Sequence, residues 1–231
     1  MAKQATVTVD RKREIALGYF ALLYGAILFF LLLDNLFWYI RYSQAYRFIY
    51  MFTNQANLLM MLWLFLFGIT RFIKKDTRSK RFATHHITVA AVTLYMTIVF
   101  LVVVLVLFAF YRSLFADHLV GYGVWLFTHL ISIIIMHVFF FLVRTGAVRS
   151  AWLVSVYLLI YPLLFLAMSF IIGFTTDAFP YDFLDPHFYP HIAVYVVSLV
   201  GLATAFWAIG FLILLLQRYL WRNLGEKNSG T

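Results

Sequence analysis

Six apolar stretches, each long enough to cross a lipid bilayer, place the strongest constraint on how this chain can fold. An α-helix rises 1.5 Å per residue, so about 20 apolar residues cross roughly 30 Å of hydrocarbon. Because hydrocarbon offers no partner to backbone amides and carbonyls, spanning stretches of this length are helical. The sequence predicts an all-α polytopic membrane protein in which residues 1–231 form a single six-helix transmembrane domain. The stretches are residues 15–40, 48–69, 86–110, 120–143, 151–174 and 190–216.

The composition excludes a water-soluble globule. Of the 231 residues, 65% are hydrophobic and only 12% are charged, whereas a soluble domain has about 25% charged residues. The same apolar content excludes an intrinsically disordered chain. The chain has no cysteine, which excludes disulfides, thiolate catalysis and metal sites built on thiolates.

The net charge of +9 is explained by membrane topology rather than by nucleic acid. Cytoplasmic loops of membrane proteins are enriched in Lys and Arg. With six alternating helices, 15 of the 18 basic residues fall on one side, in residues 1–14, 70–85, 144–150 and 217–231. This asymmetry predicts cytoplasmic tails at both ends, membrane lipids as partners and no nucleic-acid partner.

Thr53 and His129 are the leading candidates for chemistry within the membrane. A polar side chain at membrane depth costs free energy unless it is paired or faces a cavity, so such residues are functional candidates. If their helices begin near Ala45 and Val120, both residues lie about 12–13 Å below the outer face. A threonine hydroxyl becomes a useful nucleophile when a base lies within hydrogen-bonding reach. Equal depth therefore predicts Thr53 as the nucleophile and His129 as its base.

Other polar side chains on the same helices have supporting roles in this hypothesis. Asn57 shares a helical face with the candidate nucleophile, and it or Asn54 is predicted to donate hydrogen bonds to an oxyanion. Ser132 is predicted to orient the imidazole. His137, two turns deeper, is the alternative base. The non-catalytic alternative is that the threonine bonds its own helix backbone and the histidines and amides bridge helices.

The acidic loop at residues 175–191 is predicted to roof a polar cavity in the outer half of the bundle. Its prolines stiffen the backbone. Tyr161, which precedes Pro162 in the fifth stretch, is predicted to line the same cavity. Asp185 is expected to accept backbone or tyrosine hydrogen bonds. His191, beyond a proline, does not share a helical metal-binding face with it, so the sequence predicts no metal and no cofactor.

Three motifs carry a family resemblance. They are "FTNQANLLMMLW" at residues 52–63, "LFTHLISIII" at residues 126–135 and the loop "FPYDFLDP" at residues 179–186. Together they resemble a bacterial family of six-span membrane proteins. That family is similar to the eukaryotic androgen-induced membrane proteins, which are threonine hydrolases that cleave fatty acid esters of hydroxy fatty acids.

The resemblance implies an activity and a location. The family threonine falls on Thr53 and the family histidine on His129, which implies hydrolysis of a lipid ester in the inner membrane of a bacterium. Two positions depart from the family pattern, with Ile133 and Asp182 where prolines usually stand. The alternatives are a non-enzymatic lipid-binding protein or a small-solute transporter, and a transporter is expected to contain broken helices or internal repeats.

Overall fold

A computed structural model describes residues 2–73, 75–103, 127–143, 145, 148 and 150–228, with side chains between residues 11 and 220 of those ranges. The described residues form helices and turns, with no strand among them. The elements are α1 (Ala2–Arg41), α2 (Ala45–Tyr50), α3 (Phe52–Phe72), α4 (Arg78–Ala83), α5 (His86–Leu101), η2 (Phe127–Ile131), α8 (Ser132–Leu142), α9 (Ala151–Leu158), α10 (Ile160–Thr176), η3 (Asp182–Leu184), η4 (Pro186–Phe188) and α11 (Ile192–Asn228).

Four helical segments among the described residues are long and apolar enough to cross a membrane. They are Arg11–Arg41, Phe52–Phe72, Ala151–Thr176 and Ile192–Leu220. Two shorter apolar helices, His86–Leu101 and Phe127–Leu142, correspond to the third and fourth predicted stretches. The rest of those two stretches lies within residues 104–126, outside the described part of the chain. The all-α prediction is confirmed for the described residues, which contain four helices long and apolar enough to cross a membrane.

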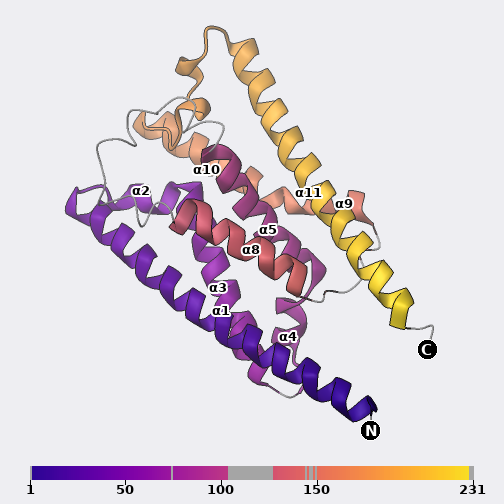
Figure 1. Cartoon of the computed structure of the whole chain (residues 1–231). Helices are drawn as coiled ribbons and strands as arrows, with labels where there is room; N and C mark the ends of the chain where they lie inside the picture. Colours follow the sequence, from indigo (N-terminus) through magenta and orange to yellow (C-terminus); the bar gives the residue numbers. More distant parts are fainter. Residues whose placement is uncertain are drawn as a thin grey trace.

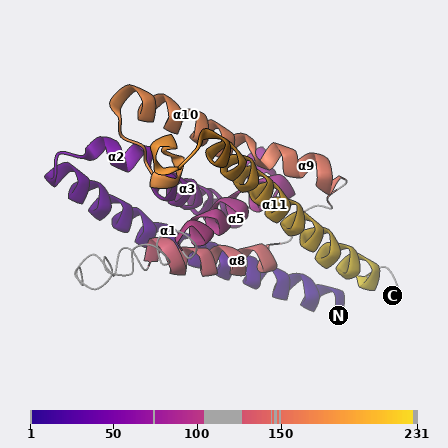
Figure 2. The same ribbon diagram turned by 90° about the horizontal axis from the view of Figure 1, so that it is seen from above.

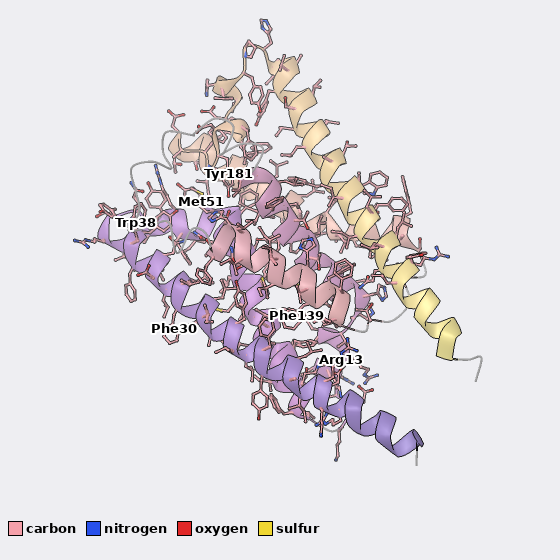
Figure 3. The ribbon with its side chains drawn as sticks, in the orientation of Figure 1. Arg13, Phe30, Trp38, Met51, Phe139 and Tyr181 are labelled. Atoms are coloured by element: carbon pink, nitrogen blue, oxygen red, sulfur yellow. The ribbon has the colours of Figure 1, made fainter. Side chains whose placement is uncertain are left out.

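Large apolar side chains cover the outer surface of these helices. Phe30 on α1, Ile171 on α10 and Val197 on α11 are each at least 67% exposed, and Figure 3 shows Phe30 pointing away from the bundle. A soluble monomer rarely exposes apolar patches of more than a few hundred Å². Exposure on this scale fits a surface that contacts lipid.

The helices form a bundle with α1 along one side and α11 along the other (Figure 1). Seen from above, α3 and α5 lie between these two long helices (Figure 2). The α1–α3 contact is close because it contains glycine: a Cβ atom at Gly68 would lie 2.7 Å from Leu22 and 3.0 Å from the Gly18 carbonyl oxygen. Small residues let membrane helices approach and gain van der Waals contact.

The second predicted stretch is divided into two helices. Met51 is extended, with φ −78° and ψ 123°, so α2 ends before it and α3 begins after it. Polar side chains of the next turn replace the helical bonds lost at the break: Asn54 Nδ2 donates to the Phe48 carbonyl (3.1 Å) and Gln55 Nε2 to the Ile49 carbonyl (2.7 Å). The prediction of one helix from Ala45 is therefore wrong, and the depth deduced from it does not apply.

The fifth stretch also has a break, at Leu159 between α9 and α10. Pro162 has no backbone N–H, so the carbonyl of Leu158, four residues earlier, loses its helical donor. The Tyr95 hydroxyl from α5 donates to that carbonyl at 3.4 Å. The proline therefore creates a contact between α5 and this helix pair.

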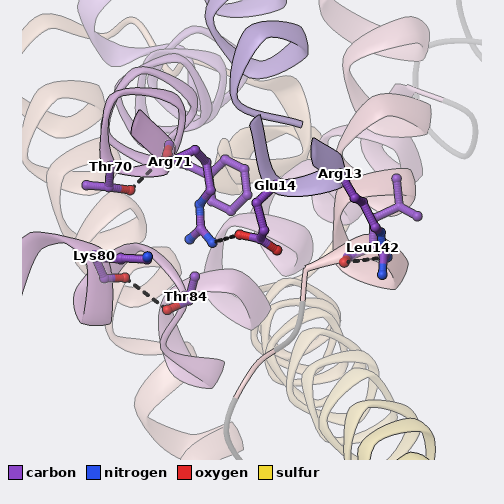
Figure 4. Close-up of polar contacts among 8 residues, drawn as sticks. Arg13, Glu14, Thr70, Arg71, Lys80, Thr84 and Leu142 are labelled. Atoms are coloured by element: carbon purple, nitrogen blue, oxygen red, sulfur yellow. Dashed lines mark hydrogen bonds and ion pairs between the residues drawn. The ribbon is translucent and has the colours of Figure 1, made fainter. Parts of the chain in front are cut away.

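The end of the bundle that holds both chain termini has its own polar contacts (Figures 1 and 4). Arg71 on α3 is buried and pairs with Glu14 on α1. Its guanidinium also lies 4.2 Å from the Phe67 ring centroid. Arg13 donates to the Leu142 carbonyl at 3.2 Å. These contacts join α1 to α3 and α8 at the end opposite the 177–191 loop.

Candidate active site

Thr53 is the second residue of α3 and is only 8% exposed. The first amides of a helix have no intrahelical acceptor, and no side chain caps this helix. The Tyr181 hydroxyl, from the loop between α10 and α11, lies close to the Thr53 side chain and to the backbone of Phe52 and Thr53. The candidate nucleophile therefore lies at a helix N-terminus beside a phenol.

Asn54, the next residue, links α3 to α1. Its Oδ1 accepts from Asn35 Nδ2 at 2.9 Å. Because one Nδ2 hydrogen of Asn54 goes to the carbonyl of Phe48, its side chain mainly holds the α1–α2–α3 junction together. This polar junction lies at the loop end of the bundle, where Figure 3 shows Met51 and Tyr181.

Asn57 is completely buried and connects α3 to η2. Its Nδ2 donates to the Thr53 carbonyl at 2.9 Å and to the Thr128 carbonyl at 3.0 Å. A primary amide has two N–H donors, so both are used by the backbone. Its Oδ1 has no partner among the described residues. The side chain thus joins the backbone of Thr53 to that of the residue before His129.

His129 lies in η2, a single π-helical turn, and its side chain is partly exposed. Its Nδ1 is 2.9 Å from the Thr128 hydroxyl oxygen. Turns of this type interrupt α-helices most often at functional sites. The structure therefore places the two predicted catalytic residues on adjacent elements linked through Asn57.

Ser132 and His137 connect α8 to neighbouring helices. Ser132 Oγ donates to the Phe127 carbonyl at 2.8 Å and lies 2.9 Å from the Tyr24 hydroxyl of α1. His137 Nδ1 is 2.8 Å from the Ile133 carbonyl, and its Nε2 is 3.3 Å from Thr97 Oγ1 of α5. His137 therefore bonds its own helix through Nδ1 and joins α8 to α5 through Nε2.

Tyr161, in the first turn of α10, contacts the first turn of α3. Its hydroxyl donates to Gln55 Oε1 at 2.7 Å. Its ring centroid is 5.5 Å from that of Phe52 and 4.7 Å from that of Tyr95. Tyr161 therefore supports the helix that carries Thr53 and also contacts α5.

An apolar groove passes beside this site, between α5, α10, the loop and α11. The cavity within it measures about 50 Å³, and the rest of the groove is open. Phe52, Tyr181 and Phe183 line it at the Thr53 end. Leu199 and Phe206 of α11 form the opposite wall. The groove has the apolar lining that an acyl chain requires, and its lining includes the residue before Thr53 and the tyrosine that contacts it.

The loop that carries Tyr181 is held by several contacts. The Asp185 carboxylate accepts from the His187 backbone N–H at 2.8 Å and lies 2.9 Å from His187 Nδ1. The Tyr195 hydroxyl donates to the carbonyl of Leu184, which is 2% exposed. Within the described ranges, no three His, Asp or Glu residues are grouped as potential metal ligands.

Two residues of this site were not predicted from the sequence. Tyr181 lies in the loop that the resemblance identified, five residues beyond α10, so its return to the bundle end was foreseeable but its contact with Thr53 was not. Thr128 precedes His129, and α-helical spacing gives no reason to pair neighbouring side chains. The π-turn geometry brings these two together.

No family model, no curated protein and no solved structure matches this chain. The family resemblance described from the motifs remains a prediction.

Proposed function

We propose that this chain is an intramembrane hydrolase of lipid esters, such as fatty acid esters of hydroxy fatty acids. The observation that carries the proposal is the position of Thr53, a buried hydroxyl whose helix begins beside an apolar groove. The residue before it and the tyrosine that contacts it both line that groove. An acyl chain in the groove would bring its ester carbonyl to the polar end, where the candidate nucleophile lies.

The proposal includes six spanning helices with both termini in the cytoplasm of a bacterium and the Tyr181 loop on the outer side of the inner membrane. The location of 15 of 18 basic residues supports the orientation. The two chain ends at one end of the bundle fit an even number of spans (Figure 1). The substrate would enter from the outer leaflet.

In the proposed reaction, the Thr53 hydroxyl oxygen attacks the ester carbonyl carbon as His129 takes its proton. The tetrahedral intermediate then expels the alcohol, which receives that proton from His129. Water, activated by the same imidazole, hydrolyses the acyl-threonine and releases the fatty acid. His129 is preferred to His137 because Asn57 joins the backbone of Thr53 to that of Thr128, the residue before His129.

The second candidate function is binding of a lipid without chemistry. The same apolar groove favours it, since an acyl chain can occupy the groove whether or not Thr53 reacts. The break between α9 and α10 at Leu159 is the feature that a transporter would use. Both functions predict a threonine that is never acylated, so acylation separates them from the hydrolase.

The test is acylation of purified protein in nanodiscs, followed by intact mass and by turnover of a hydroxy-fatty-acid ester. An acyl-reactive ester probe should add one acyl group to the wild type and none to Thr53→Ala. Thr70→Ala is the matched control, because Thr70 is also a buried threonine on the same helix, and its hydroxyl bonds only the Phe67 carbonyl in the described structure. Equal acylation and turnover in wild type and Thr53→Ala would refute the threonine mechanism.

A further inference from the structure

Among the loop residues that the structure describes, Tyr181 has its hydroxyl close to the candidate nucleophile. Its ring stacks on Phe183, with centroids 5.2 Å apart, and lies 6.2 Å from Phe165 of α10. These two contacts hold the ring against the groove wall, and the hydroxyl reaches the Thr53 side chain and the first backbone groups of α3. The phenol therefore has a fixed place at the point where an ester carbonyl would meet Thr53.

Ester hydrolysis by a threonine requires a hydrogen-bond donor for the oxyanion that forms at the carbonyl oxygen. Such donors are most effective when they are already in position and shielded from water. Asn57 does not meet this need, because both of its amide hydrogens are donated to backbone carbonyls. Asn54 donates one amide hydrogen to the Phe48 carbonyl, and its side-chain oxygen accepts a hydrogen bond from Asn35.

We propose that the Tyr181 hydroxyl donates the hydrogen bond that stabilises this oxyanion, an inference that rests on the hydrolase function proposed above. The backbone of Phe52 and Thr53 at the start of α3 lies beside the same hydroxyl. A helix N-terminus carries partial positive charge, which also favours an anion there. The arrangement places the donor on the loop and the nucleophile on the helix, so the site is complete only when the loop is docked.

The protonation state of Tyr181 suits this role. Burial raises the pKa of its hydroxyl above the ordinary value of 10.0, although the neighbouring Thr53 opposes the effect. Tyr39 and Tyr161 are titratable groups near the hydroxyl, and the Tyr39 phenol raises this pKa further. Tyr181 therefore stays a neutral O–H donor throughout the physiological range.

Each bond that forms in the proposed step is matched by a bond that breaks. As Thr53 Oγ1 bonds to the carbonyl carbon, its proton passes to His129 and the carbonyl π pair moves onto oxygen. Tyr181 keeps its proton and donates a hydrogen bond to that oxyanion. When the intermediate collapses, the carbonyl re-forms, the bond to the alcohol oxygen breaks, and His129 returns the proton to the alcohol.

The first test compares Tyr181→Phe with Tyr189→Phe in purified protein. Tyr189 is a matched control because its hydroxyl also donates within this loop, to the Phe183 carbonyl at 2.9 Å, and has no described bond to Thr53. Tyr181→Phe should lower kcat by about 10²–10³-fold, the usual cost of one oxyanion donor, with KM nearly unchanged. Tyr189→Phe should leave kcat within about threefold of wild type. An equal fall in both variants would assign the effect to loop stability and overturn the proposal.

The second test uses a fatty trifluoromethyl ketone, which forms an oxyanion on reaction with the nucleophile, and the matching methyl ketone, which does not react. Tyr181→Phe should lose affinity for the first ligand by the factor lost in kcat and keep its affinity for the second. If the phenylalanine variant does not fold, 3,5-difluorotyrosine at position 181 keeps the ring and hydroxyl but lowers the pKa of the phenol. Turnover should then fail at a lower pH than in wild type, and an unchanged pH profile would overturn the proposal.

These outcomes separate the inference from the function on which it rests. If wild type shows no turnover that depends on Thr53, the hydrolase proposal and the role of Tyr181 both fail. If Thr53→Ala is inactive but Tyr181→Phe keeps wild-type kcat and ketone affinity, only the role of Tyr181 is refuted.

Discussion

Thr53 and His129 illustrate how two side chains can be related through a third. Asn57 donates to the backbone at Thr53 and at Thr128, so it ties the start of α3 to the π-helical turn that carries the histidine. A buried amide with both hydrogens used is costly to remove, because two carbonyls lose their partner. At the residue scale, the geometry of the proposed pair therefore depends on a side chain that performs no chemistry.

We expect the losses of Thr53 and His129 not to add, because a nucleophile and its base act as one unit. Thr53→Ala and His129→Ala should each lower ester turnover by at least the factor of about 10²–10⁴ that general-base catalysis supplies. The double variant should be little worse than either single variant. The measurement is kcat/KM for the three variants and for Thr53→Ser, which keeps a hydroxyl and should keep part of the activity.

His137→Ala is the control for this cycle. Because His137 joins α8 to Thr97 of α5, its loss should lower the melting temperature while turnover per folded molecule stays within a few-fold. Full activity in His129→Ala combined with loss in His137→Ala would move the base to His137. Multiplicative losses in the double variant would contradict the paired mechanism.

At the scale of elements, the bundle depends on the close approach of α1 and α3. Gly18 and Gly68 face each other, and the Arg71 side chain packs over Gly18, where an added Cβ atom would lie 2.8 Å from the Arg71 Cβ. The Arg71–Glu14 pair lies at the same contact. Because the two glycines and the ion pair require the same spacing between the helices, one substitution at this contact should disturb both.

Gly68→Ala should destabilise the protein by about 1–3 kcal/mol, the range found when a methyl group is forced into a packed interface. The matched control is Gly201→Ala on α11, where an added Cβ atom meets nothing within 4 Å. There the higher helix propensity of alanine should leave stability unchanged or raise it by up to about 1 kcal/mol. Thermal unfolding in one detergent measures both, and equal stability of the two variants would contradict close α1–α3 packing.

At the scale of the whole molecule, the chain ends and the 177–191 loop lie at opposite ends of the bundle (Figure 1). The absence of cysteine from the sequence makes single-cysteine labelling clean. In intact cells, a membrane-impermeant thiol reagent should label cysteine introduced at Asp182 and should not label cysteine introduced at Ser79 until the cells are opened. The reverse pattern would invert the proposed orientation.

Much of this protein is determined by the sequence itself. Length and apolarity of a stretch decide whether it can cross a bilayer, because hydrocarbon leaves backbone groups no partner outside a helix. Four of the predicted stretches accordingly appear as helices of spanning length, and parts of the other two as shorter apolar helices. Thr53, Asn57 and His129 were recognisable as candidates for the same reason, since a polar group in an apolar stretch requires a partner.

The tertiary structure decided what those polar groups contact. Neither proline nor glycine occurs at the Met51 break, so the sequence gives no local signal for it. The break depends on the side chains of Asn54 and Gln55, which donate to backbone carbonyls of α2. The contact of Tyr181 with Thr53 joins residues 128 positions apart. Local pattern fixes the helices because their hydrogen bonds are local. The site is assembled from side chains on separate elements, and its geometry depends on how those elements pack.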